Sequence, residues 1–172
     1  MRVLLLTAAV AVALAAPVQA AGLLKVGDPF PPWSLTDQAG VPVSSAELAG
    51  KTYLLWFYPK AMTPGCTKEG CTLRDNFAEF KKADVDVLGI SFDVPADNAE
   101  FVKQQNFPFR LLSDETKEFS VKVGAADSTS RLWARRISFL VGPDGKILRS
   151  YGAVNPTGHA AEVLADLAAL KK

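Results

Sequence analysis

The sequence predicts an α/β fold with a central mixed β-sheet flanked by helices. Two continuous apolar runs, residues 53–58 and 85–91, have the pattern of strands that are covered on both faces. Leu73, Phe77 and Phe80 recur at helical spacing between these runs. The chain closes with a hairpin pattern and a helix, so one sheet with helices on its faces is the expected architecture.

The elements can be placed in order along the chain. Short strands around residues 33–36 and 41–43 are expected to form an N-terminal hairpin. Ser44 or Ser45 then caps a turn of helix through Leu48. The later elements are the strand at 53–58, a helix from Cys66 to about Lys82, the strand at 85–91, a helix over about 98–105 capped by Asp97, a short strand at 110–112, a helix over about 115–123 capped by Ser113 or Asp114, a hairpin of 137–141 and 146–151, and a closing helix over about 157–170. This order is typical of a thioredoxin-like fold with an N-terminal β-hairpin extension.

Residues 1–20 have the pattern of a secretory signal peptide. Arg2 supplies a basic start, an apolar run follows through Ala16, and Val18-Gln19-Ala20 resembles a cleavage site. The apolar run is shorter than the roughly 20 residues that a spanning helix needs, which disfavours an uncleaved membrane anchor. We therefore expect a protein that is periplasmic or otherwise exported, with one domain over residues 21–172 and no membrane attachment after cleavage.

The composition argues against several kinds of partner. The formal charge is +1 for the whole chain and 0 without residues 1–20, because Arg2 is the only charged residue in that segment. A neutral domain is not expected to bind nucleic acid or an anionic membrane. Two cysteines and one distant histidine fall short of the four ligands of a structural zinc site. No metal and no cofactor are therefore expected.

Both cysteines lie in the segment Thr63-Pro64-Gly65-Cys66-Thr67-Lys68-Glu69-Gly70-Cys71. Pro64 suits the first turn of a helix, so Cys66 is expected within that turn, on the inward face. Unpaired backbone N–H groups and the helix dipole stabilise an anion at this place. The position therefore favours a reactive thiolate.

Cys71 lies five residues after Cys66, about 8.6 Å away between Cα atoms on a regular helix. Disulfides rarely span more than about 7 Å between Cα atoms. A bond between these cysteines therefore requires the first helical turns to unwind. Disulfides persist in exported proteins, which leaves a static bridge as the alternative.

With these residues placed, the sequence resembles a peroxiredoxin of the bacterioferritin-comigratory or PrxQ type, an atypical two-cysteine subfamily. The resemblance spans roughly residues 24–170, and the spacing from Cys66 to Cys71 is typical of this subtype. It is carried by residues 57–67, by Cys71 with Arg74-Asp75 behind it, and by Arg136-Ile137-Ser138-Phe139 with Asp144-Gly145-Lys146-Ile147.

The resemblance implies a thiol-dependent peroxidase that reduces hydrogen peroxide and organic hydroperoxides. Cys66 resembles the peroxidatic cysteine and Cys71 the resolving cysteine. The Cys66 sulfenate would condense with Cys71 to an intramolecular disulfide, which a thioredoxin-like dithiol then reduces. Such a protein serves antioxidant defence and redox homeostasis, here in the cell envelope, as a monomer or a weak dimer.

The resemblance also implies partners for the peroxide. Thr63 and Arg136 resemble them, and Pro59, Gly65 and Tyr58 are expected to bind the substrate. Attack on the peroxide places negative charge on the leaving oxygen, so fixed hydrogen-bond donors aimed at that oxygen lower the barrier.

The identity of the arginine stays open on spacing alone. Arg131, Arg135 and Arg136 are all close to the strand, and strand alternation points neighbouring residues to opposite sides. The motif favours Arg136. His159, the only histidine, is expected to be a surface group at the start of a helix.

Two other functions stay open. A thioredoxin-like disulfide oxidoreductase of the envelope would share the fold, but its cysteines are separated by two residues, whereas four residues separate Cys66 from Cys71. A binding or structural domain with an incidental disulfide is the third possibility.

Overall fold

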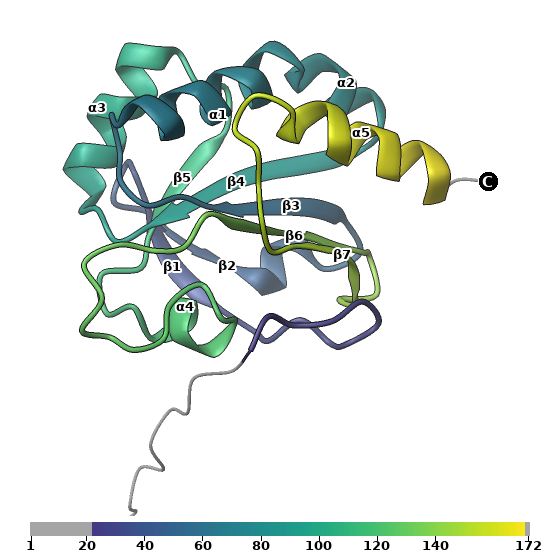
Figure 1. Ribbon diagram of the computed structural model, residues 1–172, viewed down its shortest axis with the longest axis horizontal. Helices are drawn as coiled ribbons and strands as arrows, with labels where there is room; N and C mark the ends of the chain where they lie inside the picture. Colours follow the sequence, from purple (N-terminus) through teal and green to yellow (C-terminus); the bar gives the residue numbers. More distant parts are fainter. Residues whose placement is uncertain (1–21, 171–172) are drawn as a thin grey trace, which may run out of the picture.

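The structure is a computed structural model that describes residues 22–170; the expected signal peptide lies outside the described residues. In the described part, seven strands form one mixed sheet with the order β2-β1-β5-β4-β3-β6-β7 (Figure 1). The strands are β1 (Ser34–Asp37), β2 (Pro42–Ser44), β3 (Thr52–Phe57), β4 (Val85–Ser91), β5 (Arg110–Ser113), β6 (Ile137–Val141) and β7 (Ile147–Tyr151). The predicted α/β fold class is confirmed.

The helices alternate with the central strands. They are η1 (Ser45–Leu48), a 3-10 helix, and the α-helices α1 (Pro64–Asp75), α2 (Phe77–Lys82), α3 (Pro95–Gln105), α4 (Glu118–Lys122) and α5 (His159–Leu170). Between residues 22 and 170, no helix has the length and apolar character needed to cross a membrane.

The pairing of the strands brings two distant parts of the chain together at one edge of the sheet. β3 pairs in parallel with β4 and antiparallel with β6. Phe57, the last residue of β3, lies opposite Ile137, the first residue of β6. The residues that follow Phe57 and the residue that precedes Ile137 therefore meet at the same place.

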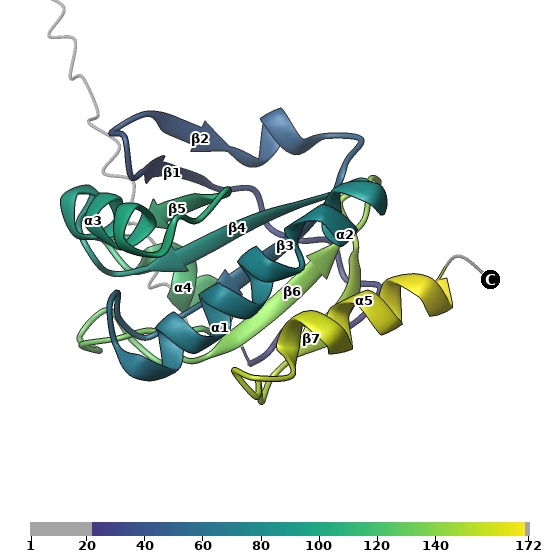
Figure 2. The ribbon, with the colours of Figure 1, turned by 90° about the horizontal axis from the view of Figure 1, so that it is seen from above.

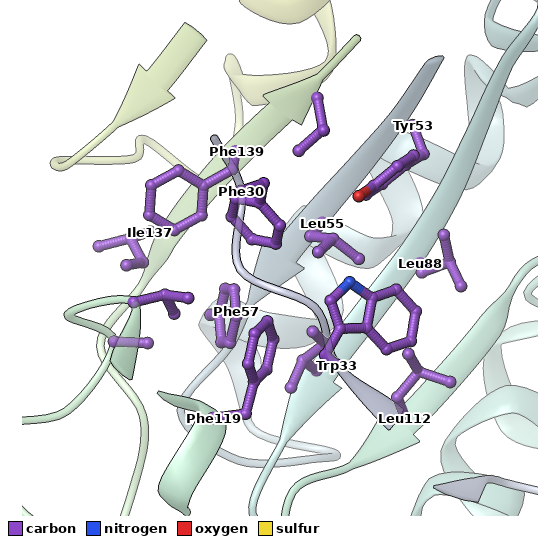
Figure 3. Close-up of a cluster of buried hydrophobic side chains, with 14 of the residues drawn as sticks. Phe30, Trp33, Tyr53, Leu55, Phe57, Leu88, Leu112, Phe119, Ile137 and Phe139 are labelled. Carbon is purple, nitrogen blue, oxygen red and sulfur yellow. The ribbon is translucent and has the colours of Figure 1, made fainter. Parts of the chain in front are cut away.

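Helices cover the two faces of the sheet unequally. Helices α1, α2, α3 and α5 lie on one face, whereas α4 and the N-terminal segment lie on the other (Figures 1 and 2). On the second face, Phe30 and Trp33 pack with Phe119 of α4 against side chains of the central strands (Figure 3). Burial of these aromatic side chains stabilises a rigid sheet, on which the loops at its edge are held.

The bounds of several helices differ from those expected. The helix expected from Cys66 to about Lys82 is two helices, because Asn76 leaves helical geometry and its Nδ2 donates to the carbonyl of Thr72 at 2.8 Å. Helix α3 begins at Pro95, which takes the first helical position, so Asp97 is inside the first turn instead of capping it.

Helix α4 is shorter than the segment 115–123 expected for it. Lys117 adopts a left-handed conformation with φ 63°, which delays the start of the helix. The buried carboxylate of Asp114 instead accepts the N–H of Ser120 at 2.7 Å.

Candidate active site

The turn between β3 and α1 is held in a fixed shape. Ala61 donates its N–H to Asp93 Oδ2 at 2.8 Å, which ties the turn to the loop after β4. Met62 has φ 60°, a left-handed conformation that is costly for a side chain of this size. Thr63 is extended, and Pro64 is the first residue of α1, as the sequence predicts.

Cys66 is the third residue of α1 and is fully buried. Its Sγ lies 3.4 Å from Nη2 of Arg136, which donates to it. The expected inward orientation of Cys66 is therefore found. The guanidinium thus places a hydrogen-bond donor and a positive charge directly beside the buried sulfur.

Arg136, the residue directly before β6, joins the sulfur to a buried carboxylate. Its Nη1 forms an ion pair with Oε2 of Glu69 in α1. Burial opposes the guanidinium charge, but the hydrogen bonds to Cys66 and Glu69 and their charges outweigh it, so the pKa of Arg136 is raised. Gly65 permits this approach, because a Cβ at that position would lie 3.0 Å from Nη2.

The two neighbouring arginines point to different places. Arg135 pairs with Asp127 and donates to the carbonyl of Gly124, and its side chain is half exposed. Arg136 has 20% of its side chain exposed and contacts Cys66. Of the candidates left open by the spacing, the structure brings Arg136 to the sulfur.

Two buried residues behind Arg136, Glu69 and His159, have no signal in the sequence. Glu69 is fully buried, although glutamate in a helix is usually exposed. The expectation that His159 lies on the surface is wrong: His159 is fully buried, and its Nδ1 lies 2.8 Å from Glu69 Oε1. The start of α5 packs against α1, which encloses both side chains.

The other expected site residues lie around the turn. Thr63 donates its hydroxyl to the carbonyl of Lys60 at 2.9 Å. Tyr58 is fully buried, and its hydroxyl donates to Asn98 Oδ1 at 2.6 Å. Burial raises the pKa of Tyr58 well above its ordinary value, so this hydroxyl stays neutral. Pro59 is partly buried and borders a groove of about 330 Å³.

Cys71 has a looser environment than Cys66. It is partly buried, and its S–H donates to Oε1 of Gln105, the last residue of α3, at 3.5 Å. Arg74 donates to the carbonyl of Gln105 at 2.7 Å. Both cysteines are free thiols on one continuous helix in this structure.

Gly70, directly before Cys71, allows α1 to approach a buried aromatic ring. A Cβ at Gly70 would lie 2.4 Å from Cζ of Phe107. Phe107 stacks on Phe109 and packs edge-on against Phe101. The segment between the cysteines therefore combines close packing with a residue of low helix propensity.

Comparisons with known proteins give the family. The model of the AhpC/TSA family matches residues 26–150. Peroxiredoxin Bcp of Escherichia coli K12 is 43% identical over 146 residues, which cover 82% of this chain and 94% of that relative. The fold of the present chain is similar to that of peroxidoxin BcpB from Mycobacterium tuberculosis. The TM-score is 0.80 at 33% identity, with coverage of 87% of this chain and 99% of that one.

A third similar protein is the bacterioferritin comigratory protein of Xanthomonas campestris, solved in a study of its alkyl peroxide reduction activity. The TM-score is 0.75 at 30% identity, with coverage of 81% of this chain and 92% of that one. The family resemblance found in the sequence is thereby confirmed. This chain belongs to the AhpC/TSA family, as a peroxiredoxin of the bacterioferritin-comigratory type and thus a thiol-dependent peroxidase.

Proposed function

We propose that Cys66 is the thiolate that attacks the hydroperoxide. The observation that supports this best is the contact of 3.4 Å between its buried Sγ and Arg136 Nη2. The guanidinium stabilises the anionic sulfur before attack and the charge on the leaving oxygen during it. Arginine suits both tasks because it stays charged and offers several donors in a rigid plane.

The proposed peroxidase reaction has three steps: attack on the peroxide, formation of the disulfide and reduction of the disulfide. The thiolate of Cys66 forms a bond to one peroxide oxygen while the O–O bond breaks, which converts Cys66 to a sulfenic acid. The other oxygen leaves as hydroxide or alkoxide and takes a proton from solvent, to which the thiol had earlier lost its own, to give water or an alcohol. The sulfenic acid then condenses with the thiol of Cys71, which forms the disulfide and releases water. A thioredoxin-like dithiol reduces the disulfide and is itself oxidised.

Thr63 and the first turn of α1 are placed to orient the peroxide. The Thr63 hydroxyl donates to the carbonyl of Lys60, so the lone pairs on its oxygen remain to accept a hydrogen bond from the O–H of the peroxide. Gly65 and Cys66 are the second and third residues of α1, so their N–H groups have no intrahelical acceptor and can donate to the substrate.

Organic hydroperoxides are proposed as substrates beside hydrogen peroxide. The lining of the groove next to Pro59 includes four apolar side chains, which suit an alkyl group, beside the charged side chains of Lys60, Asp93 and Asp97; the apolar residues are Phe92, Val94, Leu132 and Trp133. The similar Xanthomonas protein is described as active on alkyl peroxides. Both observations support the wider substrate range.

Resolution by Cys71 is proposed to need local unwinding of α1. Both cysteines are helical in the reduced form, at a spacing too long for a disulfide. We expect amide exchange over residues 64–74 to be faster in the oxidised protein than in the reduced protein. Equal protection of this segment in the two forms would contradict the proposal. Because resolution occurs within one chain, a monomer or a weak dimer suffices.

Export to the cell envelope is proposed from the pattern of residues 1–20 alone. Expression of the full chain in a bacterium is expected to give periplasmic protein whose first residue is Ala21 or Gly22. Intact mass after fractionation measures this. A cytosolic product of full mass would overturn the proposal.

One assay tests the catalytic assignment. Consumption of hydrogen peroxide and of tert-butyl hydroperoxide is followed with dithiothreitol for the wild type, Cys66→Ser and Cys71→Ser. Cys66→Ser is expected to lose about 1000-fold or more, because removal of a nucleophile removes the covalent route. Cys71→Ser is expected to remain active, because dithiothreitol reduces the sulfenic acid directly.

The same proteins distinguish the alternative function. A disulfide oxidoreductase would reduce insulin in the presence of dithiothreitol and consume no peroxide. Peroxide consumption that persists in Cys66→Ser would refute the role of this cysteine.

A further inference from the structure

His159 is a fully buried polar side chain that takes no part in the three proposed steps of the peroxidase reaction. It is the first residue of α5, and the edge of its ring faces Tyr151 of β7 with ring centroids 5.5 Å apart. Its contact with Glu69 joins positions 90 residues apart in the sequence. A buried imidazole in contact with a buried carboxylate costs desolvation, so its retention calls for a physical reason.

The two oxygens of Glu69 have two different donors. A carboxylate only accepts, so the Nδ1 of His159 carries the proton that is shared with Oε1. Oε2 accepts from Nη1 of Arg136. Among the described residues, Nε2 of His159 has no hydrogen-bond partner, so Glu69 is the one side chain to which the ring is hydrogen-bonded there.

These contacts form one chain from α5 to the reactive sulfur: His159 to Glu69, Glu69 to Arg136, and Arg136 to Cys66. The guanidinium is planar, so the oxygen that binds Nη1 also sets the direction in which Nη2 points. The Glu69 carboxylate can hold that direction only while its own rotation is blocked. His159 blocks it from the side opposite Arg136.

We propose that His159 is a positioning residue of the peroxidase, which holds Glu69 so that its carboxylate aims Arg136 at the sulfur and at the leaving oxygen. The inference rests on the proposed roles of Cys66 and Arg136. Without the imidazole, Oε1 of Glu69 is buried without a donor. The carboxylate then turns, and the guanidinium loses its fixed direction.

Three substitutions of His159 separate the hydrogen bond from the packing. In His159→Asn the side-chain amide nitrogen takes the place of Nδ1, whereas in His159→Gln it takes that of Nε2; His159→Leu keeps only volume. The second-order rate constant of Cys66 oxidation by hydrogen peroxide is measured by stopped flow, together with the melting temperature. We expect Leu and Gln to be slower by about 10- to 100-fold and Asn by about 3-fold or less.

A double-mutant cycle tests whether His159 acts through Arg136. In the Arg136→Ala background, His159→Leu is expected to slow the reaction by less than about 2-fold, because the group it positions is gone. Tyr151→Phe is the control for packing: it removes the hydroxyl bond to Asp166 between β7 and α5 but leaves Glu69 untouched. Its rate constant is expected within about 2-fold of the wild type.

Equal losses from His159→Leu in the wild-type and Arg136→Ala backgrounds would overturn the inference. So would an Asn variant as slow as the Leu variant at equal folded fraction, or a Leu variant with the wild-type rate. If His159→Leu does not fold, the comparison of Asn with Gln decides alone. Failure of the catalytic proposal is seen separately, as peroxidase activity that survives in Cys66→Ser.

Discussion

The two cysteines of α1 sit in opposite kinds of surroundings, although only four residues separate them. Cys66 is fully buried, and a charged side chain that is itself held by a buried carboxylate donates to its sulfur. Cys71 is partly buried; its thiol donates to Gln105 at 3.5 Å, and the guanidinium of Arg74, which is more exposed than that of Arg136, lies beside it. The first cysteine is fixed and the second is only loosely held.

This difference matches the two roles proposed for the cysteines, attack on the peroxide by Cys66 and disulfide formation by Cys71. Attack on a peroxide depends on donors that are in place before charge develops, so rigidity around Cys66 lowers the barrier. Disulfide formation depends on movement, because the helical spacing is too long for the bond. Gly70 lies between the two regions and lowers the helix propensity where movement is needed.

The largest expected effect comes from removal of the Arg136 side chain, which contacts Cys66 but not Cys71. Arg136→Ala should slow oxidation of Cys66 by about 100- to 1000-fold, because it removes the fixed donor at the sulfur and the leaving oxygen. Arg135→Ala is the matched control, since Arg135 pairs with Asp127 at the surface, and should stay within about 2-fold. Stopped-flow kinetics with hydrogen peroxide measures both. The opposite ranking of the two variants would show that the wrong arginine has been assigned.

A methyl group added at Gly70, between the two cysteines, should lower the stability of the folded protein. Gly70→Ala gains about 1 kcal/mol of helix propensity, but its Cβ would lie 2.4 Å from the buried Phe107 ring, an overlap that costs about 1–3 kcal/mol. We expect a net loss of up to about 2 kcal/mol in the free energy of unfolding, measured with urea. Gly158→Ala, where no atom lies within 4 Å, is the control. A Gly70→Ala variant more stable than the wild type would show that α1 and Phe107 separate easily.

The smallest expected effect comes from the partner of Cys71. Gln105→Ala removes the acceptor of the thiol, while the backbone carbonyl that binds Arg74 remains. The lifetime of the Cys66 sulfenic acid should shorten by about two- to five-fold, because Cys71 loses one weak hydrogen bond and keeps only its contact with Arg74. Trapping of the sulfenic acid and mass spectrometry measure the lifetime. Gln104→Ala, whose amide binds Glu100 on the surface, should leave it unchanged.

Much of this arrangement can be predicted from local patterns. The apolar runs give β3 and β4, Pro64 gives the start of α1, and the motif around Arg136 selects this arginine from its neighbours. Each of these signals lies within a few residues of the feature that it predicts. The break at Asn76 also had such a signal, because asparagine competes with the helix through its side chain.

Glu69 and His159 have no comparable signal. A glutamate beside Lys68 on a helix looks solvated, and a histidine after Pro156-Thr157-Gly158 looks like part of a surface turn. Both are buried because α5 packs across α1, a contact between segments that are 90 residues apart. Glu69 and His159 become partners only in the tertiary structure, so the residues next to each of them in the sequence indicate an exposed position.

The pairing of Phe57 with Ile137 has a practical consequence for engineering. Arg136 directly precedes β6, so the pairing of β6 with β3 fixes the position of its backbone. The length of the loop before Arg136 therefore does not determine that position. Ser128, Thr129 and Ser130 are exposed at the far part of that loop. A foreign peptide grafted there should leave the guanidinium in place, which would make this loop a site for coupling a fluorescent reporter to a working peroxide scavenger.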